Sequence, residues 1–590
     1  MMISHQADTQ AHLSAEADDR QTPVSSAAAD LEGLNVFARL GRFPIGDDVF
    51  GVARELRCLY SDKNSPSPTE KAALGKNAQH TPLRETKLVS RRTFSEALQR
   101  RYQEKANDEA VSGLHRTAPA ASAKHLMSTG QWIVAIAILA SLLVGLAIAP
   151  IAALITLNAA ATLYLVGAIL FRLYLAWSVV DHKLDGDAPA IPADADLPTV
   201  TILLPLYRET RSLPILADSI SALDYPKEKL DIKLILEADD RGTLKEAERL
   251  GLDQQFDFII VPPGAPQTKP KACNYALAFS RGALTVIYDA EDTPEPDQLK
   301  KAAAAFASGP EDMVCVQARL NYYNADENWL TRLFALEYAL WFDSLLPALH
   351  KMDAPIPLGG TSNIFITEKL RELGGWDPYN VTEDADLGLR IARRGFRTGL
   401  IDSTTLEEAN CKTPNWLRQR SRWMKGYIQT WFVNMREPSA MSGKGGLGGF
   451  LSTHMFIGGT VFSALINPIL WAVFAYWLAT RSEGVNALFP EPLMTLNLFA
   501  LLFGNALFIY LAMLAPLKRG WPALSPAALL APIYWWLTSI AAYKAVWQLI
   551  TRPWFWEKTR HGVSAASDAK RRAAIARVRA ANGVIKSDAA

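Results

Sequence analysis

Five long apolar stretches lie on the two sides of a polar middle section of the chain. Two runs, joined at Pro150, precede that section and three follow it: Trp132 to Ala149, Ile151 to Val180, Phe450 to Thr480, Leu493 to Pro516 and Ala527 to Ile550. Each is long enough to cross a hydrocarbon core of ~30 Å at ~1.5 Å per residue. The pattern predicts a multi-pass membrane protein with a transmembrane hairpin over 131–180 and further transmembrane helices over 450–516.

The last apolar run differs from the other four. Five full crossings would separate the two termini, yet Lys518, Arg519 and the basic residues of the tail favour the cytoplasm. The run also carries aromatic and basic side chains typical of a helix in the interface: Tyr534, Trp535, Trp536, Tyr543, Lys544, Trp547 and Trp554. We predict that 527–562 contains an interfacial helix, with a fifth span as the alternative, and that 563–590 is a basic cytoplasmic tail.

The polar middle section, 197–438, alternates short apolar runs with helical patterns. The apolar runs have the length of buried strands: Thr199 to Pro205, Ile232 to Leu236, Phe256 to Val261, Leu284 to Tyr288 and Met313 to Gln317. Such alternation predicts an α/β domain whose parallel strands bind ligand at their carboxyl ends. Chemistry is therefore expected where these strands end.

The amino-terminal region, residues 1–125, shows fewer patterns that predict structure. Residues 1–30 are rich in Ala, Asp, Gln and Ser and are predicted to be disordered. The following part, 31–125, has one helical pattern, Phe94 to Leu114, and is interpreted as a small cytoplasmic segment.

Composition narrows the class of protein. Hydrophobic residues make up 49% of the chain, while 61 basic and 60 acidic residues nearly balance, so nothing favours nucleic acid as a partner. The four cysteines lack CxxC spacing, which indicates reduced thiols rather than a zinc site.

Acidic and aromatic residues follow the first two strands. Tyr207 and Glu209 come after one, and Glu237-Ala238-Asp239-Asp240 ends the next. These side chains could bind a base and its ribose, although each, taken alone, is more often part of a solvated loop. A helix then opens at Thr268 with Lys271 and Asn274 in its first turns, a favourable place for a diphosphate.

Three acidic or basic motifs complete the pattern. Asp289 and Glu291 follow a strand, where two carboxylates can share Mg²⁺ or Mn²⁺. Thr382-Glu383-Asp384 precedes a helix, for which capping is the alternative role. Gln419-Arg420-Ser421-Arg422-Trp423 lies on a basic amphipathic helix that could equally be a membrane anchor.

In this order and at these separations, the motifs resemble the family 2 glycosyltransferases, and within them the membrane-embedded processive synthases of the cellulose, chitin and hyaluronan type. The resemblance covers roughly Thr199 to Pro438. It implies a GT-A-type nucleotide-sugar-binding domain on the cytoplasmic face of a bacterial inner membrane, inserted between transmembrane helices. It further implies inverting transfer from a UDP-sugar to a growing β-linked polysaccharide, coupled to export, with export or regulatory proteins as partners.

The resemblance also implies a role for each matching residue. Asp384 would be the catalytic base, and Asp289 and Glu291 would bind the metal. The acceptor and diphosphate would contact Thr382, Glu383, Gln419, Arg422 and Trp423. The nucleotide-sugar would contact Tyr207, Glu209, Asp239, Lys271 and Asn274.

Two departures from the family pattern leave alternatives open. Glu291 stands where the family has a second Asp, so Asp292 is a competing ligand. The usual Asp-Asp-Gly-Ser nucleotide motif is replaced by Glu-Ala-Asp-Asp-Arg-Gly, so Glu237 and Asp240 compete with Asp239. Gly359 to Asn363 resembles an acceptor loop, and Trp556 to Thr559 is interpreted as a gating segment.

Two other functions compete with polysaccharide synthesis. A non-processive enzyme that adds one sugar to a lipid carrier would use the same donor site. A transport component with a nucleotide-sensing domain would not need a base and a metal pair, and the apolar runs contain few ionisable residues.

Overall fold

The computed structural model describes strands β1 (Arg42–Ile45) and β2 (Arg54–Arg57) and residues 91–178, 189–438, 446–559 and 573. The predicted disorder of 1–30 and nearly all of the basic tail lie outside these residues. β1 and β2 pair antiparallel and belong to a separate compact unit, 1–89. Everything discussed below belongs to the second unit, which begins at Ser90.

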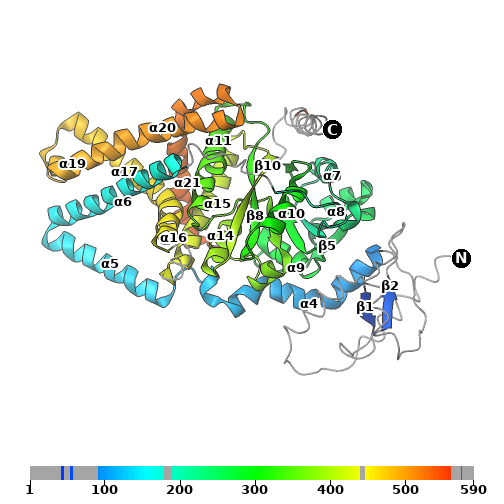
Figure 1. Cartoon of the computed structure of the whole chain (residues 1–590). Coiled ribbons are helices and arrows are strands. Elements are labelled where there is room, and N and C mark those ends of the chain that lie inside the picture. Colours follow the sequence, from blue (N-terminus) through cyan, green and yellow to red (C-terminus); the bar gives the residue numbers. More distant parts are fainter. Residues whose placement is uncertain are drawn as a thin grey trace. The chain divides into compact units, whose positions relative to one another are not determined.

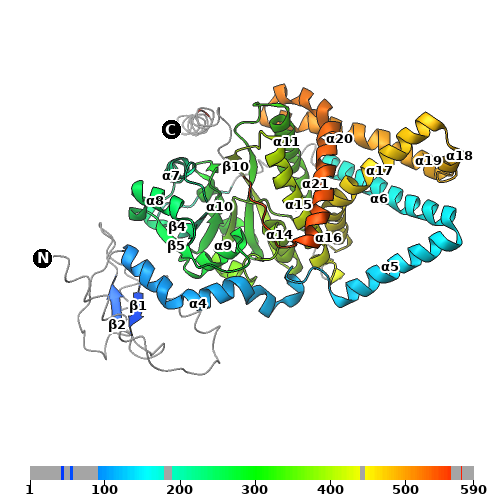
Figure 2. The same cartoon turned by 180° about the vertical axis from the view of Figure 1, so that it is seen from behind.

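Five helical stretches among the described residues are long and apolar enough to cross a membrane. They are Thr129–Ile148, Pro150–Ser178, Gly448–Thr480, Glu491–Arg519 and Pro522–Thr551. The first two, α5 and α6, form the predicted hairpin (Figures 1 and 2). Ser128 begins α5 with a capping box, and Pro150 begins α6, where a missing N–H costs no helical hydrogen bond.

The middle section folds as one mixed sheet of eight strands, in the order β5-β4-β3-β6-β9-β8-β10-β7, where β10 is Arg397–Glu407 and β7 is Thr293–Pro294. Five strands match the predicted runs: β3 (Val200–Leu206), β4 (Leu230–Glu237), β5 (Asp257–Val261), β6 (Leu284–Ile287) and β8 (Met313–Tyr322). β3 to β6 are parallel, and β9 (Asn363–Ile366) is antiparallel to both β6 and β8. The predicted α/β class is confirmed, and the five predicted strands run in the same direction; the antiparallel strand β9 was not predicted.

Helices cover this sheet and connect it to the membrane region. The elements that carry the site are α9 (Lys269–Ala278), α11 (Trp329–Leu340), α14 (Glu383–Arg393) and α15 (Thr413–Asn434). Further helices are α7 (Leu213–Ser221), α8 (Arg241–Arg249), α10 (Gln298–Ser308), α12 (Leu346–Lys351) and α13 (Thr367–Glu372). The membrane region continues with α16 (Gly446–Thr453), α17 (Gly459–Thr480), α18 (Glu483–Asn486), α19 (Glu491–Leu498), α20 (Asn505–Leu514) and α21 (Ala531–Thr551).

The helix predicted near residue 94 is α4 (Arg91–Thr117), which packs on α9 and β5. Gln99 donates to the carbonyl of Phe258 at 2.8 Å and accepts from the N–H of Ile260 at 3.0 Å. Its side chain thereby satisfies backbone groups of β5, which stands at the edge of the sheet.

A buried ion network joins the amino-terminal ends of β4 and β5. Lys233 Nζ lies 2.9 Å from Asp231 and 2.7 Å from Asp257, and all three side chains are buried. Arg281 donates two further hydrogen bonds to Asp231. The network lies at the opposite ends of the strands from the predicted site, so its role is structural.

We expect Lys233→Met to lower the free energy of unfolding by about 3–5 kcal/mol, because it leaves two buried carboxylates with one fewer cation. Thermal unfolding of the purified protein measures the effect. Arg249→Met, which breaks the exposed pair with Glu246, is the control and should change little. Equal behaviour of the two variants would contradict this account.

Both ends of the last apolar stretch contact the sheet-containing domain. Before it, Arg519 pairs with Asp343 at 2.5 Å. After it, Lys425 and Gln429 of α15 donate to the carbonyls of Phe555 and Pro553. Between these points α21 packs along α15 (Figure 2). Contacts of both ends with one domain favour an interfacial helix over a fifth span.

If 522–551 does not cross the membrane, both chain termini lie on the same side as the sheet. A reporter enzyme active only in the cytoplasm, fused after Ala590, should therefore be active. A fusion placed at Ser482, between α17 and α19, should give the opposite result. Activity only of an externally active reporter after Ala590 would establish five spans.

Candidate active site

A cavity of about 1200 Å³ opens at the carboxyl ends of the central strands. It reaches from Tyr207, after β3, through the acidic loop after β6 to the starts of α14 and α15. Its far end is lined by the membrane helices, including Arg172 of α6 and Thr460 of α17. The predicted motifs therefore meet in one space that continues toward the membrane.

At the strand end of the cavity, Tyr207 and Asp239 form a polar group. The Tyr207 hydroxyl donates to Asp239 Oδ2 at 3.1 Å, and Gln267 Nε2 donates to Oδ1 at 3.2 Å. Lys558 lies 3.0 Å from Glu209 and 5.3 Å from the centre of the Tyr207 ring. Tyr207 and Glu209 both line the cavity, as a nucleotide site requires.

The three candidate acids after β4 have different surroundings. Asp240 caps α8, accepting from the N–H groups of Arg208 and Thr243, so its carboxylate is committed to the fold. Glu237 lines the cavity, and burial raises its pKa to about 7. Asp239 contacts the cavity through Tyr207. Glu237 and Asp239 are therefore the candidates for the nucleotide.

Lys271 and Asn274 do not face the cavity, which corrects the predicted diphosphate contacts. Lys271 is fully buried and donates to the carbonyls of Pro262 and Gly264. The amide nitrogen of Asn274 donates to the carbonyl of Trp376, and its amide oxygen accepts from the N–H of the same residue. Two residues turn a helix by about 200°, so Lys269 points the other way and lines the cavity. Its ammonium lies 2.5 Å from Asp289 Oδ1.

The loop after β6 carries two carboxylates that line the cavity and a third that is buried away from it. Asp289 and Glu291 line the cavity. Asp292 is fully buried and closes the turn, accepting from the N–H of Asp289 at 2.7 Å and from the hydroxyl of Thr361. Of the two competing metal ligands, Glu291 is the one with access to the cavity.

Glu407 is a cavity carboxylate that the sequence analysis missed. β10 (Arg397–Glu407) pairs antiparallel with the short β7 (Thr293–Pro294), in a register that sets Leu406 against Thr293. The next position places Glu407 opposite the acidic loop, and it lines the cavity. Burial, followed by the charges of Asp292, Glu291 and Asp289, raises the pKa of Glu407 well above its ordinary value.

These residues fit a hard divalent cation. The cavity-facing donors are carboxylate oxygens, which Mg²⁺ and Mn²⁺ prefer, and their mutual repulsion would be relieved by a cation. Within the described ranges no group of three or more His, Cys, Asp or Glu residues is arranged as a complete metal site. Two protein carboxylates with remaining positions for donor phosphates is the arrangement that suits such an ion.

The predicted base stands at the start of α14. Asp384 and Glu383 both line the cavity, and a Cβ at Gly360 would lie 3.3 Å from Asp384 Oδ2. Burial raises the pKa of Asp384, and it raises that of Glu383 to about 8 with the charge of Asp384 as the second cause. The cations of Lys269 and Arg422 oppose both shifts.

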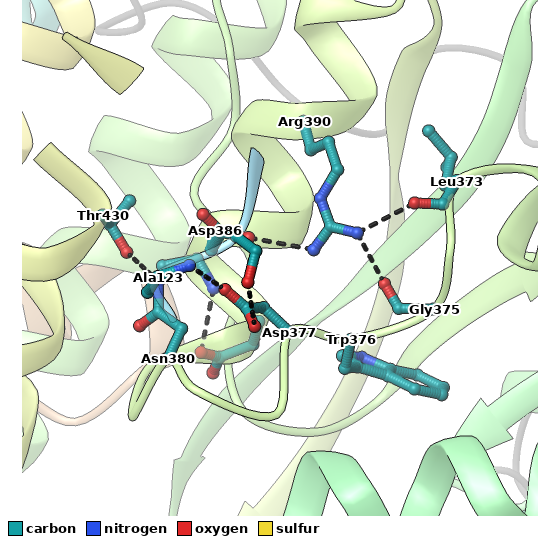
Figure 3. Close-up of polar contacts among 12 residues, drawn as sticks. Ala123, Leu373, Gly375, Trp376, Asp377, Asn380, Asp386, Arg390 and Thr430 are labelled. Atoms are coloured by element: carbon teal, nitrogen blue, oxygen red, sulfur yellow. Dashed lines mark hydrogen bonds and ion pairs between the residues drawn. The ribbon is translucent and has the colours of Figure 1, made fainter. Parts of the chain in front are cut away.

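A polar cluster anchors α14, the helix that begins with this pair (Figure 3). Asp386 bonds Arg390 at 2.9 Å, and Arg390 donates to the carbonyls of Leu373 and Gly375. Asn380 donates to Thr430 of α15 at 2.9 Å. Asp386 is thus bound to the fold, which leaves Asp384 and Glu383 as the acids of α14 that line the cavity.

On α15, the predicted acceptor residues Gln419, Arg422 and Trp423 all line the cavity. Arg422 donates to the carbonyl of Val381 at 3.2 Å, and its guanidinium lies 4.5 Å from the centre of the Trp556 ring. Trp423 lies nearly parallel to the Tyr338 ring. Arg420, which the prediction passed over, is held by two hydrogen bonds to Glu337.

The segment 552–559 lies across the cavity. Arg552 to Trp556, together with Lys558 and Thr559, line it. Glu557 pairs with Lys544 at 2.8 Å, while Lys558 reaches Glu209 beyond β3. Within it, Trp556 to Thr559, the part predicted to gate the site, contacts the nucleotide end through Lys558 and the acceptor end through Trp556.

Comparisons with known proteins identify two matching family models. "Glycosyl transferase family 2" matches residues 201–366, and "Glycosyl transferase family group 2" matches 284–539. A probable glycosyltransferase, YdaM, of Bacillus subtilis is 27% identical over 237 residues, covering 39% of this chain and 56% of the relative. A β-monoglucosyldiacylglycerol synthase of Synechocystis is 27% identical over 278 residues, covering 45% and 56%. The matches span about half the length of these relatives.

Among solved structures, a mannosyltransferase of Pyrobaculum calidifontis in complex with GDP-Man and Mn²⁺ aligns with a TM-score of 0.46. It is 21% identical, and the alignment covers 67% of this chain and 99% of that one.

Proposed function

Because the chain belongs to the family 2 glycosyltransferases, with a GT-A-type domain and flanking apolar helices, we propose that it transfers sugar from a UDP-sugar to a growing β-linked polysaccharide that is exported across the membrane. One observation carries the proposal. A single cavity joins the nucleotide end at Tyr207, the acids of α14 and the membrane helices. Donor and acceptor can therefore enter it from opposite ends.

Asp384 takes the proton of the acceptor hydroxyl, whose oxygen then attacks the anomeric carbon of the donor. The new glycosidic bond forms as the bond to the diphosphate breaks, and the electron pair leaves with UDP. Attack from the opposite face converts an α-linked donor into a β-linked product. Asp384 suits the role because it lies half-buried in the cavity wall.

Lys269 and Arg422 are the cations placed to contact the leaving diphosphate. Both line the cavity, and the negative charges of Glu383 and Asp289 act to raise the pKa of each. Asp289 and Glu291 would hold Mg²⁺ or Mn²⁺, which would neutralise charge on the departing nucleotide. Segment 552–559 would lie over the donor, with Lys558 beside Glu209 and Trp556 beside Arg422.

Product analysis tests the proposal. Purified protein is given each of a panel of UDP-sugars, and UDP release and product length are measured together. The proposal expects one preferred donor and a polymer that β-specific hydrolases degrade. A product carrying a single sugar on lipid would establish the non-processive alternative.

Trp423→Ala should separate polymerisation from donor cleavage. Without this aromatic surface against the sugar, labelled polymer should fall to background, while slow UDP release by hydrolysis continues because Asp384 and Lys269 are unchanged. The measurement compares both products side by side. Normal polymer formation would show that this part of α15 only anchors the domain.

A further inference from the structure

A second cavity, of about 460 Å³, lies between the membrane helices. It shares Arg172, Thr460, Glu337 and Arg420 with the catalytic cavity, so the two spaces adjoin. Along α17 its lining runs from Thr460 to Trp477, about 25 Å at ~1.5 Å per residue, which approaches the ~30 Å of a hydrocarbon core. Most of the lining is apolar, supplied by α6, α17, α19, α20 and α21.

Arg172 and Arg420, the two arginines where the cavities adjoin, differ in whether a carboxylate balances their charge. Arg420 is neutralised by Glu337 and surrounded by four aromatic rings. Arg172 donates to the hydroxyl of Thr460 at 3.3 Å and lies 5.2 Å from the centre of the Phe508 ring. In the described part of the chain, no carboxylate lies within ion-pair distance of Arg172. A cation so placed in a membrane helix indicates an anionic ligand.

The position of Arg172 fixes how such a ligand would lie. Arg172 precedes the end of α6 at Ser178 by six residues, about 9 Å of helix, on the side of the sheet domain. That depth corresponds to lipid head groups, and the apolar lining continues from there toward Trp477. An anion at Arg172 with hydrocarbon below it is therefore an amphiphile oriented as in a bilayer leaflet.

Before a glycan chain has grown, hydrocarbon suits this space better than a polysaccharide does. Each buried sugar hydroxyl needs a partner, and leaving it unpaired costs about 1–3 kcal/mol. Several lining amides already bond protein groups: Asn486 accepts from Trp477, Asn497 donates to Leu493 and Asn158, and Asn505 donates to Leu501. Hydrocarbon requires no such partners.

We propose that this cavity binds an anionic lipid, with its phosphate at Arg172 and its hydrocarbon between α6, α17 and α20, and that this lipid primes the glycan. The priming role rests on the proposed function, because it places the first acceptor hydroxyl at the membrane end of the catalytic cavity. The lipid phosphate takes no part in bond breaking. It holds the primer while the first sugars are added.

Binding is measured with the full chain in phosphatidylcholine nanodiscs, using three probes: dodecyl phosphate, dodecanol and inorganic phosphate. Dodecyl phosphate should bind and raise the unfolding temperature, whereas the other two should have little effect. Arg172→Gln should weaken dodecyl phosphate by about tenfold or more, and Arg172→Lys should restore part of the loss. Lys351→Gln, which removes an exposed cation near the same end of α6, should bind as wild type does. UDP affinity, unchanged in every variant, shows that they are folded.

Three binding results would overturn the proposal: wild-type affinity in Arg172→Gln, equal binding of inorganic phosphate, or equal binding of dodecanol. For priming, radiolabelled product from the earliest turnovers should extract into chloroform–methanol, and a wholly water-soluble product would exclude a lipid primer. If no UDP-sugar supports transfer but dodecyl phosphate still binds through Arg172, the proposed function fails while the lipid site stands.

Discussion

Asp384→Asn is expected to lower turnover by ~10²-fold to 10⁴-fold, the range for loss of a general base. Asparagine keeps the shape of the side chain but cannot take a proton. Donor binding should survive, because the nucleotide end at Tyr207 and the cations Lys269 and Arg422 are unchanged. UDP release gives the turnover, and calorimetry gives the UDP affinity.

Glu383→Gln is the matched control, since Glu383 is the neighbouring acid that lines the same cavity. Near-normal turnover in Asp384→Asn with loss in Glu383→Gln would move the base by one residue. Asp386 is an unsuitable substitute because it is bonded to Arg390 behind the helix.

The dependence of turnover on pH should also identify Asp384 as the base. Burial raises the pKa of Asp384 and raises that of Glu383 to about 8, so this pair retains a proton at higher pH than ordinary carboxyls. A base acts in its deprotonated form. Wild-type turnover should therefore fall as the pH drops through the raised pKa of Asp384, and the residual turnover of Asp384→Asn should lack that dependence.

The apolar runs and most of the sheet could be predicted because their signals are local. A membrane helix needs only its own composition, and β3 to β6 and β8 each lie on a short, mainly apolar run of the sequence. β9 has four residues and runs antiparallel between β6 and β8, which only tertiary pairing determines. The contacts between α21 and α15 likewise depend on tertiary packing that no local sequence pattern shows.

The site residues also divide into those that the sequence could predict and those that depend on tertiary structure. Motif order predicted the residues at the strand ends and at the start of α14, because each lies within a few residues of its element boundary, and it predicted Gln419 to Trp423 in the middle of α15 from their spacing. The sequence could not show that Lys269 rather than Lys271 faces the cavity, since that depends on the helical phase at which α9 begins. Glu407 required the register between β7 and β10. Reading the α9 sequence on a helical wheel would have raised the question for the lysines.

Removing divalent cations should abolish transfer, and Mg²⁺ or Mn²⁺ should restore it. Asp289, Glu291 and Glu407 gather negative charge at the wall that the donor diphosphate must approach, and Lys269 supplies one charge against them. A diphosphate would be repelled from this wall without a further cation. The measurements are UDP release in EDTA and after cation is restored, and UDP affinity by calorimetry with and without Mg²⁺.

Asp289→Asn should weaken the gain in UDP affinity that Mg²⁺ provides, while affinity without metal changes less. Glu407→Gln distinguishes two roles for the missed carboxylate. If Glu407 only repels, its loss should strengthen UDP binding in EDTA and leave the Mg²⁺ effect intact; if it contacts the ion, the Mg²⁺ effect should shrink as it does in Asp289→Asn. Full transfer in EDTA by a preparation free of bound metal would remove Asp289 and Glu291 from the metal role, and it would leave Lys269 and Arg422 as the groups that stabilise departing UDP.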